Sequence, residues 1–374
     1  MSVTVAELLD QYDPALPLAK ASTIPASWYV DPRIARLERA TTFSRHWQFA
    51  ARVDQVREPG QYATCEIAGE PVLVVRGGDG VLRGFFNVCR HHAAAVMTEP
   101  QGCARNLRCP YHGWTYTLEG ALKGTPGFMD EDGFDRAGNG LVPLDVAEWE
   151  QWVFVRLARD GPSIAEAFGQ DLLGELRALR LHELHWFERR HYVFECNWKV
   201  FVDNYLDGGY HVPHLHKGLN SVLDFKRYRV ENGPMHCLQS SPMVQGGDAA
   251  FAAVRGGDRA LYYWFHPGFM LNWYEGKMDT NIVRPLGVER TEVVFDFWFA
   301  DVSEAARGHN LASVAAGDLV QDEDMAICHS VQRGLNSRAY STGRLSARRE
   351  AGEHLFHRLL HADLVAGLAA AVAP

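Results

Sequence analysis

The stretches FNVCRHH at residues 86–92 and LRCPYHGW at residues 107–114 decide how this sequence folds. Each supplies one cysteine and one histidine, in the patterns Cys-x-His and Cys-x-x-His, and seventeen residues separate the two halves. Proline and glycine in the second stretch favour a tight loop over a helix or a strand. The spacing therefore predicts a metal site that two loops build together, with four ligands: Cys89, His91, Cys109 and His112.

The surrounding sequence predicts that strands carry these loops. Between residue 47 and about residue 158, short runs rich in Val, Phe and Tyr alternate with Gly and Pro, which is typical of an all-β domain. Two thiolates suit one iron and two imidazoles suit a second, which is the ligand set of a Rieske 2Fe-2S centre. The alternative is a tetrahedral zinc site. Zinc fingers pair Cys with Cys and His with His, so the mixed halves fit zinc poorly.

Composition places the chain among ordinary globular proteins. It has 374 residues, of which 47% are hydrophobic and 22% charged, and its net charge of −9 argues against a nucleic-acid or anionic-membrane partner. No run of 18 apolar residues occurs, so we expect no membrane span. Seven cysteines scattered over this length indicate a reducing compartment, and we expect a cytoplasmic protein.

A second cluster of metal-binding residue types follows at residues 197–216, NWKVFVDNYLDGGYHVPHLH. On a helix, Asp203, Asp207 and His211 fall at i, i+4 and i+8 and share one face. His211 and His216 would lie about 140° apart around an ideal helix, so an unbroken helix cannot aim both at one metal. Two glycines and a proline in this segment supply the break. A carboxylate from elsewhere would complete a two-histidine, one-carboxylate triad with open positions.

That carboxylate is expected from a later helix, predicted over residues 318–333, which carries three consecutive acids at 322–324. Consecutive acids are usually solvated, so at least two of them are expected to face solvent. Two alternatives stay open here. The histidines could be solvated on a surface helix, and His211 could pair with His214 instead of His216.

Together the two clusters resemble the large (alpha) subunit of the Rieske non-heme iron ring-hydroxylating oxygenases. The resemblance runs from about residue 44 to 358 and is nearest to the choline monooxygenase-like and betaine-demethylating branch. The supporting strings are DNYLD at 203–207, YHVP at 210–213, HKGL at 216–219 and MDTN at 278–281.

This resemblance implies an α+β fold, in which an all-β Rieske domain is inserted in a helix-grip catalytic domain made of an antiparallel sheet and a long helix. We expect an N-terminal helical segment at 1–43 that packs on the catalytic domain. The Rieske domain is expected at 44–158 and the catalytic domain at 159–374.

The resemblance also implies the ligands of both metals. Cys89, His91, Cys109 and His112 would hold the cluster. His211 and His216 would bind mononuclear iron, which leaves His214 in the pocket or behind the ligands. By the same resemblance Asp324 is the third iron ligand, with Asp322 in reserve.

One position departs from the family pattern. Many members carry an acid three residues before the first iron histidine, where it links to a Rieske histidine of the neighbouring subunit. Here that position is Gly208. Asp207 is therefore the expected link, with Asp203 as the alternative, and Asn204 of the same string is expected in the catalytic site.

The implied activity is that of the terminal oxygenase component of a multicomponent system. It would use O₂ and two electrons to hydroxylate, or oxidatively demethylate, a small organic substrate. A quaternary ammonium compound such as choline or a betaine is favoured, and aromatic-ring dioxygenation is the alternative. The electrons would come from NAD(P)H through a separate ferredoxin or a flavin/iron–sulfur reductase. A head-to-tail homotrimer is expected, because a closed ring gives every iron a donor.

An aromatic run is expected to wall the substrate pocket, where rings could hold a quaternary ammonium group. A buried core is the plainer interpretation of such strands. The residues are Trp264, Phe265, Phe269, Leu271, Asn272, Trp273, Tyr274 and Glu275. Two other classes of function are a stand-alone Rieske electron carrier and a zinc-stabilised ligand-binding module. Iron and zinc content would separate all three.

Overall fold

The computed structural model describes residues 3–128, 133–159 and 161–372, and the chain divides into two compact units. Residues 43–164 form one unit, and residues 1–42 together with 165–374 form the other. The sequence placed the inner boundaries at 44 and 158, a few residues from these. None of the described helices combines the length and the apolar character that a membrane crossing needs.

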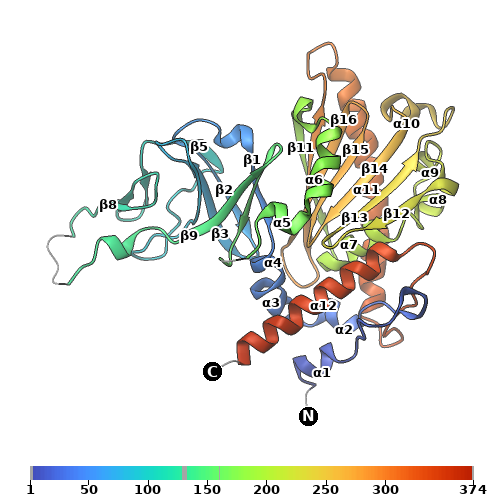
Figure 1. Cartoon of the computed structure of the whole chain (residues 1–374), viewed down its shortest axis with the longest axis horizontal. Helices are drawn as coiled ribbons and strands as arrows, with labels where there is room; N and C mark the ends of the chain where they lie inside the picture. Colours follow the sequence, from blue (N-terminus) through green and yellow to red (C-terminus); the bar gives the residue numbers. More distant parts are fainter. Residues whose placement is uncertain (1–2, 129–132, 160, 373–374) are drawn as a thin grey trace. The chain divides into compact units, whose positions relative to one another are not determined.

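The unit at 43–164 is built from strands (Figure 1). Its seven-stranded sheet has the order β1-β10-β9-β4-β3-β2-β5, and a three-stranded sheet, β6-β7-β8, stands beside it. The larger sheet consists of β1 (Gln48–Arg52), β2 (Gln61–Ile67), β3 (Glu70–Arg76), β4 (Leu82–Phe86), β5 (Gln101–Cys103), β9 (Pro143–Trp149) and β10 (Trp152–Arg156). The smaller one consists of β6 (Leu107–Arg108), β7 (Thr115–Tyr116) and β8 (Leu122–Gly124).

The two predicted metal loops leave strands of this unit. The first loop follows β4, and the second connects β6 to β7. Their cysteines belong to a buried cluster that includes Leu107, Trp114 and Tyr116. The apolar residues therefore form a core directly beneath the loops, which holds their backbone in place.

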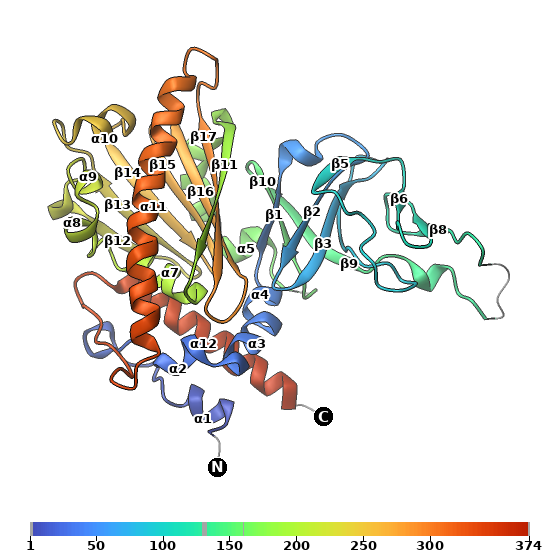
Figure 2. The same cartoon turned by 180° about the vertical axis from the view of Figure 1, so that it is seen from behind.

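The other unit is organised around a seven-stranded antiparallel sheet in the order β11-β17-β16-β15-β14-β13-β12. The helix α11 (Arg307–Leu335) runs along this sheet (Figure 2). The strands are β11 (His185–Phe194), β12 (Arg229–Asn232), β13 (His236–Pro242), β14 (Arg259–Phe265), β15 (Phe269–Tyr274), β16 (Lys277–Pro285) and β17 (Thr291–Phe299). This sheet and long helix confirm the expected α+β class.

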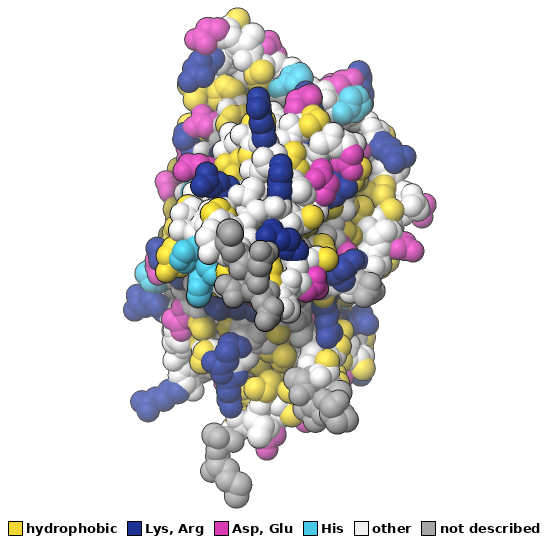
Figure 3. Space-filling view, turned by 90° about the vertical axis from the view of Figure 1, so that its left-hand side faces the viewer, with side chains coloured by type: hydrophobic (Ala, Val, Ile, Leu, Met, Phe, Trp, Pro, Cys, Tyr) yellow, Lys and Arg dark blue, Asp and Glu magenta, His cyan; other side chains and the backbone are white. Residues whose placement is uncertain are grey.

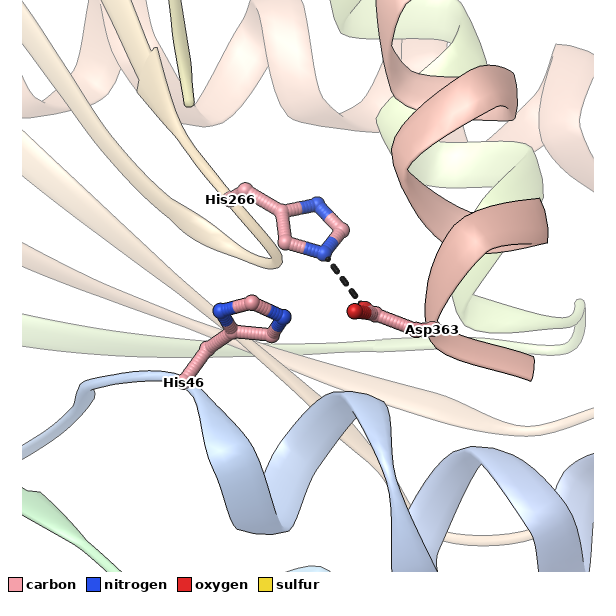
Figure 4. Close-up of side chains that lie close together, drawn as sticks. All are labelled: His46, His266 and Asp363. Carbon is pink, nitrogen blue, oxygen red and sulfur yellow. Dashed lines mark hydrogen bonds and ion pairs between the residues drawn. The ribbon is translucent and has the colours of Figure 1, made fainter. Parts of the chain in front are cut away.

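Shorter helices complete both units. They are α1 (Val5–Leu9), α2 (Ala26–Val30), α3 (Pro32–Ala40), α4 (Thr42–Arg45), α5 (Ile164–Phe168), α6 (Gln170–Ala178), α7 (Trp198–Leu206), α8 (Val212–Leu215), α9 (Lys217–Asn220), α10 (Ala249–Val254) and α12 (Ala351–Val372). The C-terminal helix α12 is tied to the sheet by a hydrogen bond between His266 Nε2 and Asp363 Oδ2 at 2.9 Å (Figure 4). His266 follows the end of β14, so this bond fixes that end of the sheet to α12.

A row of polar residues crosses four neighbouring strands of the sheet. Gln239 pairs with Tyr262, Tyr262 with Asn272, and Asn272 with Asp279. Directly opposite residues project to the same face of a sheet, so this register collects four polar side chains on one face. Such a row is costly to bury unless every member has a partner. The sheet therefore offers a place to bind something polar.

The start of α7 is held by the motif Asn-Trp-Lys. The Asn197 backbone N–H donates to Gln332 Oε1 at 2.8 Å, and its side-chain Nδ2 donates to the carbonyl oxygens of Tyr29 and Val288 at 2.9 and 2.6 Å. Asn197 Oδ1 accepts from the Lys199 N–H and so caps the helix. One asparagine thus fixes α7 against α2, α11 and the turn after β16.

Glu38 of α3 provides a second anchor for α7. Its carboxylate accepts from Trp198 Nε1 at 2.9 Å and from Lys199 Nζ at 2.6 Å, and both charged groups are almost completely buried. Burial lowers the pKa of Lys199, while the charge of Glu38 raises it in turn. A buried pair of this kind costs several kcal/mol to break. The N-terminal segment therefore packs on α7 through a specific contact.

The molecular surface carries both signs of charge. On the face drawn in Figure 3, Lys and Arg side chains are interspersed with Asp and Glu side chains and with hydrophobic residues. Interspersed charges of both signs create no single strongly charged field on this face.

Candidate metal centres and active site

The two Cys/His loops share one backbone pattern. In the first, the Cys89 N–H donates to the Ala94 carbonyl at 2.8 Å and the Ala93 N–H donates to the Cys89 carbonyl at 3.0 Å. In the second, the Cys109 N–H donates to the Trp114 carbonyl at 2.8 Å and the Gly113 N–H to the Cys109 carbonyl at 3.1 Å. Ala93 and Gly113 occupy matching places with φ of +61° and +71°. The same fold of the backbone therefore presents a cysteine and a histidine twice.

These loops bring the four predicted cluster ligands together. Cys89 and Cys109 are 3% and 2% exposed, and the ring centroids of His91 and His112 lie 4.7 Å apart. Burial raises the pKa of the Cys109 thiol, and the neighbouring Cys89 raises it further. Tyr116 Oη lies 3.3 Å from Cys89 Sγ. Two buried thiols side by side need a positive partner to ionise, which iron would supply.

The histidines also fit a cluster. Among the described residues, the Nδ1 atom of His91 is buried and has no hydrogen-bond partner. The ring of His91 stacks on Trp114, with centroids 4.6 Å apart and planes 4° from parallel. The stacking fixes the ring plane, and the unpartnered nitrogen is suited to ligate iron. His92, the next residue, is exposed and lies outside this set.

The second site is made by a break between α7 and α8. Gly208 and Gly209 have φ of +68° and +67°, a conformation that other residues rarely adopt. A Cβ on Gly208 would lie 2.1 Å from the Arg349 carbonyl oxygen, and one on Gly209 would lie 2.9 Å from the Tyr228 ring. Both glycines are therefore required by space as well as by conformation. The helix is interrupted here, as the sequence predicted.

The interruption between α7 and α8 places His211 and His216 next to each other and beside Asp324 of α11. One ring nitrogen of each histidine and one carboxylate oxygen of Asp324 lie within 4.8 Å of one another. The two rings are 4.8 Å apart at 82°, and His216 Nε2 lies 3.1 Å from Asp324 Oδ1. Two imidazoles and one carboxylate are the donor set of non-heme iron oxygenases. These three residues would hold the iron.

Carboxylates hold both imidazoles from behind. His211 Nδ1 lies 2.6 Å from Asp207 Oδ2, and His216 Nδ1 lies 2.7 Å from Glu323 Oε2. These contacts occupy Nδ1 and leave each Nε2 for a metal. Burial of His216 opposes its protonation, but the hydrogen bonds to Asp324 and Glu323 outweigh that effect and raise its pKa. The site therefore has the negative character that a divalent cation needs.

Asp324 is itself positioned by two amides. Asn204 Nδ2 donates to its Oδ1 at 2.8 Å, and Gln321 Nε2 donates to its Oδ2 at 3.2 Å. Asp322 is exposed, as is His214. The structure thus brings the favoured residues to the site, together with Asn204, and leaves both alternatives in solvent.

Asp203 and Asp207 have different surroundings although they share a helical face in the sequence. Asp203 accepts from Tyr29 Oη at 2.5 Å and lies 3.0 Å from His357 Nε2. Nearby Glu353 is buried, and its pKa is raised well above the usual value by burial and then by the charge of Asp203. Asp207 instead accepts from the backbone N–H of His211 at 2.9 Å. Of these two aspartates, Asp207 is the one that bonds to an iron-site histidine, His211.

A cavity of about 100 Å³ opens beside the triad. It lies between the helices and the polar face of the sheet. Its described lining includes Phe201, Asn204, Tyr205, His211, His216, Tyr228, Gln239, Tyr262, Asn272, Asn281, Gln321 and Asp324. A concave site with convergent polar groups next to a metal triad is where a substrate is expected to bind.

Of the eight residues expected to wall the pocket, only Asn272 is among the described lining residues. Side chains alternate along a strand, so four of them project to the face opposite Tyr262 and Asn272. These are Phe265, Phe269, Leu271 and Trp273. Glu275 is exposed after the end of β15.

The remaining two residues, Trp264 and Tyr274, project to the same face of the sheet as Tyr262 and Asn272 but are not among the described lining residues of the cavity. The Trp264 ring packs at 5.6 Å from Phe356 of α12, and Tyr274 Oη lies 2.8 Å from Tyr262 Oη. Tyr274 therefore supports a residue that does line the cavity.

Sequence reasoning missed several functional candidates. Glu323 stood in the acidic run but was expected to be solvated, and only the packing of α11 shows that it reaches His216. The cavity tyrosines come from α7, β14 and the segment before β12, which are distant in sequence. Asn281 and Asp279 were noticed only as part of a string. Strand register, invisible in one sequence, decides their roles.

Comparison with known proteins agrees with both centres. Residues 46–134 match the Rieske [2Fe-2S] domain, and residues 181–364 match the ring hydroxylating alpha subunit (catalytic domain). Choline monooxygenase of Arabidopsis thaliana is 36% identical over 374 residues, which covers 96% of this chain and 87% of the relative. The chain belongs to the Rieske ring-hydroxylating oxygenases.

Two further comparisons extend this family assignment. The carnitine monooxygenase oxygenase subunit of Escherichia coli K12 is 30% identical over 339 residues, 88% of each chain. A solved quaternary ammonium Rieske monooxygenase that oxidises carnitine superposes with a TM-score of 0.84 at 25% identity, over 94% of this chain and 98% of the other. Naphthalene 1,2-dioxygenase of Rhodococcus shares the fold, with a TM-score of 0.74 at 20% identity over 94% and 95% of the chains.

The protein is therefore a Rieske non-heme iron oxygenase with a 2Fe-2S cluster and a mononuclear iron, and it depends on O₂ and a reductase. When bound, these groups supply one-electron transfer and oxygen activation. The chain's own residues orient the ligands through Asp207, Glu323, Asn204 and Gln321. The cavity beside His211, His216 and Asp324 is where it would exclude water and hold the substrate.

We predict that His112→Ala destroys the cluster, because one of its four ligands is lost. The Rieske electron paramagnetic resonance signal and visible absorption should disappear, and iron content should fall. The matched control is His92→Ala, which removes an exposed imidazole whose ring lies 4.1 Å from that of His91. A normal Rieske signal in His112→Ala would contradict the ligand assignment.

For the mononuclear site, we predict that His211→Ala or His216→Ala lowers the iron content from about three to about two per chain and abolishes turnover. The cluster spectrum should stay intact, since its ligands are untouched. His214→Ala, which changes the exposed histidine between them, should keep all of its iron. If iron content depends on His214 and not on His216, the triad is wrongly assigned.

Proposed function

We propose that this oxygenase hydroxylates, or oxidatively demethylates, a small quaternary ammonium compound of the choline type. The observation that carries the proposal is a set of three tyrosine rings, Tyr205, Tyr228 and Tyr262, that line the cavity beside the iron ligands. Tyr228 and Tyr262 lie nearly parallel, with ring centroids 6.5 Å apart and planes at 19°. Aromatic faces attract quaternary ammonium groups through their π electrons.

The protonation state of these rings supports cation binding at their faces. Burial raises the pKa of Tyr205, Tyr228 and Tyr262 well above the usual value, so all three are neutral phenols at physiological pH. Gly209 contributes indirectly, because a larger residue there would collide with the Tyr228 ring. The curated relatives named above act on choline and carnitine, which agrees with this proposal.

Aromatic-ring dioxygenation is the second candidate. Gln239, Asn272 and Asn281 place three side-chain amides on the wall. Each of these amides already bonds to the protein, since Gln239 Nε2 donates to the Tyr205 carbonyl oxygen and both asparagines donate to Asp279. The preference for a quaternary ammonium compound therefore rests on the tyrosine rings. Naphthalene dioxygenase shares only the fold with this chain. A stand-alone electron carrier would have no use for the iron triad, and a zinc-stabilised module would need neither the triad nor O₂.

The electron supply is proposed to cross a subunit boundary in a head-to-tail homotrimer. NAD(P)H would feed a separate ferredoxin or flavin/iron–sulfur reductase, which reduces the cluster. Asp207 is the proposed link between His211 and a Rieske histidine of the neighbouring subunit, because its carboxylate already bonds to His211. A cytoplasmic location, expected from the scattered cysteines, is part of the same proposal.

The substrate is tested with the loaded oxygenase and a suitable reductase under ¹⁸O₂. Choline and carnitine should each be compared with naphthalene and benzoate. We expect choline to support substrate-dependent O₂ uptake and to gain one ¹⁸O atom in the product, seen by mass spectrometry. Turnover of the aromatic compounds to products with two ¹⁸O atoms, without turnover of any quaternary ammonium compound, would overturn the proposal.

The electron path is tested by Asp207→Asn. Both metal sites should fill and the cluster should be reduced normally, since no ligand changes. Oxidation of the reduced cluster by O₂ and substrate in a single turnover should slow by about 10- to 100-fold, because the link loses its charge and one acceptor. Asp203→Asn is the matched variant one helical turn away. A wild-type rate in Asp207→Asn with a slow Asp203→Asn would move the link to Asp203.

A further inference from the structure

A buried carboxylate lies beside the part of the substrate cavity that Asn272 and Asn281 line, which we call its floor. Asp279 is 7% exposed, and its Oδ2 accepts from Asn272 Nδ2 at 2.7 Å and from Asn281 Nδ2 at 2.9 Å. Asn272 and Asn281 line the cavity, whereas Asp279, on the same face of the sheet, is not among the described lining residues. The carboxylate therefore acts on the cavity through two amides.

These hydrogen bonds decide which way the amides point. A carboxylate accepts only, so both NH₂ groups must turn towards Asp279 and both carbonyl oxygens must turn away from it. Asn272 Oδ1 then accepts from Tyr205 Oη at 2.8 Å, and Asn281 Oδ1 accepts a second bond from Asn272 Nδ2 at 3.2 Å. The floor consequently presents amide oxygens and a phenol oxygen, with a carboxylate beside them.

Two basic side chains, Lys277 and Arg255, lie near Asp279, but neither is positioned to form an ion pair with its carboxylate. Burial lowers the pKa of Lys277 well below its usual value, and its Nζ donates to Ser313 Oγ at 2.9 Å. The Arg255 guanidinium lies over the Tyr274 ring at 4.7 Å. Among the described residues, no ion pair within 4.0 Å joins Asp279 to either of them.

The lining itself carries no positive partner for an anion. Among the described residues that line the cavity, none is a lysine or an arginine. A substrate carboxylate would face amide oxygens and the nearby Asp279, and no lysine or arginine among the described lining residues would pair with it. Like charges brought together in a poorly hydrated site are strongly disfavoured.

Resting on the proposed function, we propose that Asp279 is a specificity-determining positioning residue. By fixing the floor as an array of oxygen acceptors beside a buried negative charge, it selects a net cation over both a neutral isostere and a zwitterion with a carboxylate. The substrate class is then a quaternary ammonium alcohol rather than an amino-acid betaine.

The experiment compares three probes of similar shape on the metal-loaded enzyme. Choline is the cation, 3,3-dimethyl-1-butanol replaces the ammonium nitrogen by carbon, and glycine betaine adds a carboxylate. Binding is measured by calorimetry, and turnover of choline gives KM and kcat. Wild type should bind choline at least tenfold more tightly than the other two.

Asp279→Asn keeps the size of the side chain and removes its charge. We expect the affinity for choline to fall about tenfold and KM to rise with it, while the affinity for 3,3-dimethyl-1-butanol changes less than twofold. Asp279→Glu should restore most of the preference. Arg255→Gln, which removes the positive charge over Tyr274, should shift the ratio of choline to neutral binding the opposite way. A purely structural role of Asp279 would weaken both probes together.

Two pH values supply an independent readout. Burial raises the pKa of Asp279, while Arg255, Asn281, Asn272 and Lys277 lower it, and Tyr192, Tyr205 and Tyr274 are the other titratable groups close by. A raised carboxyl pKa means that the charge is gained as pH rises. Choline affinity relative to the neutral probe should therefore be higher at a pH above the pKa of Asp279 than at a pH below it, and Asp279→Asn should remove that difference.

The outcomes separate this inference from the proposed function. If wild type turns over choline but Asp279→Asn keeps the wild-type ratio of cation to neutral binding, the inference is overturned and the function stands. Tight binding of glycine betaine by wild type would also overturn it. If wild type neither binds nor oxidises any quaternary ammonium compound, the proposed function itself fails.

Discussion

The mononuclear iron site depends on the interruption of the helix at Gly208 and Gly209. A continuous helix would point His211 and His216 about 140° apart, and no rotation of side chains could bring both to one iron. Two consecutive residues with φ near +68° turn α7 into α8 within a few residues. Gly208 also lets the backbone before α12 approach, since the Arg349 carbonyl occupies the place of its missing Cβ. Iron ligation and the docking of the C-terminal segment therefore rest on the same two glycines.

Two carboxylates and two amides orient the iron-site residues that this interruption of the helix brings together. Asp207 and Glu323 fix the imidazoles, and Asn204 and Gln321 fix Asp324 in turn. Each ligand has its orientation set before metal binds, so little ordering is left for the metal to impose. A single helical face thus serves two purposes, because Asp207 serves the iron site while Asp203 is used by Tyr29 and His357 to hold α2 and α12 to α7.

The β unit, residues 43–164, presents its four cluster ligands on two loops that have the same backbone geometry. The same pair of backbone hydrogen bonds closes both Cys/His loops, and a residue with positive φ ends each of them. Ala93 fills that place in the first loop and Gly113 in the second. An alanine in this conformation costs of the order of 1 kcal/mol, which the surrounding core must offset. The shared geometry explains how spacings of two and three residues can serve one cluster.

The sequence by itself determined the chemistry of this protein. Cys-x-His, Cys-x-x-His and the broken helix with two histidines carry their meaning in local spacing, because each ligand pair is built within one loop. Local periodicity predicted the long helix, and the family resemblance carried by these motifs implied the α+β fold and Asp324 as the third ligand. Local reasoning could also name Asp207 as a partner of His211, because both residues lie within one turn of the chain.

Only the tertiary structure decided which residues surround the substrate. The aromatic run at 264–275 was expected to form the pocket, yet strand register turns half of it to the other face of the sheet. The cavity wall is instead assembled from α7, α8, α11 and four strands, whose proximity no local pattern encodes. Glu323 was expected to be solvated, whereas the packing of α11 places its carboxylate against His216. Asp279 gains its role from a cross-strand pairing with Asn272, and pairing between strands is a property of the folded sheet alone.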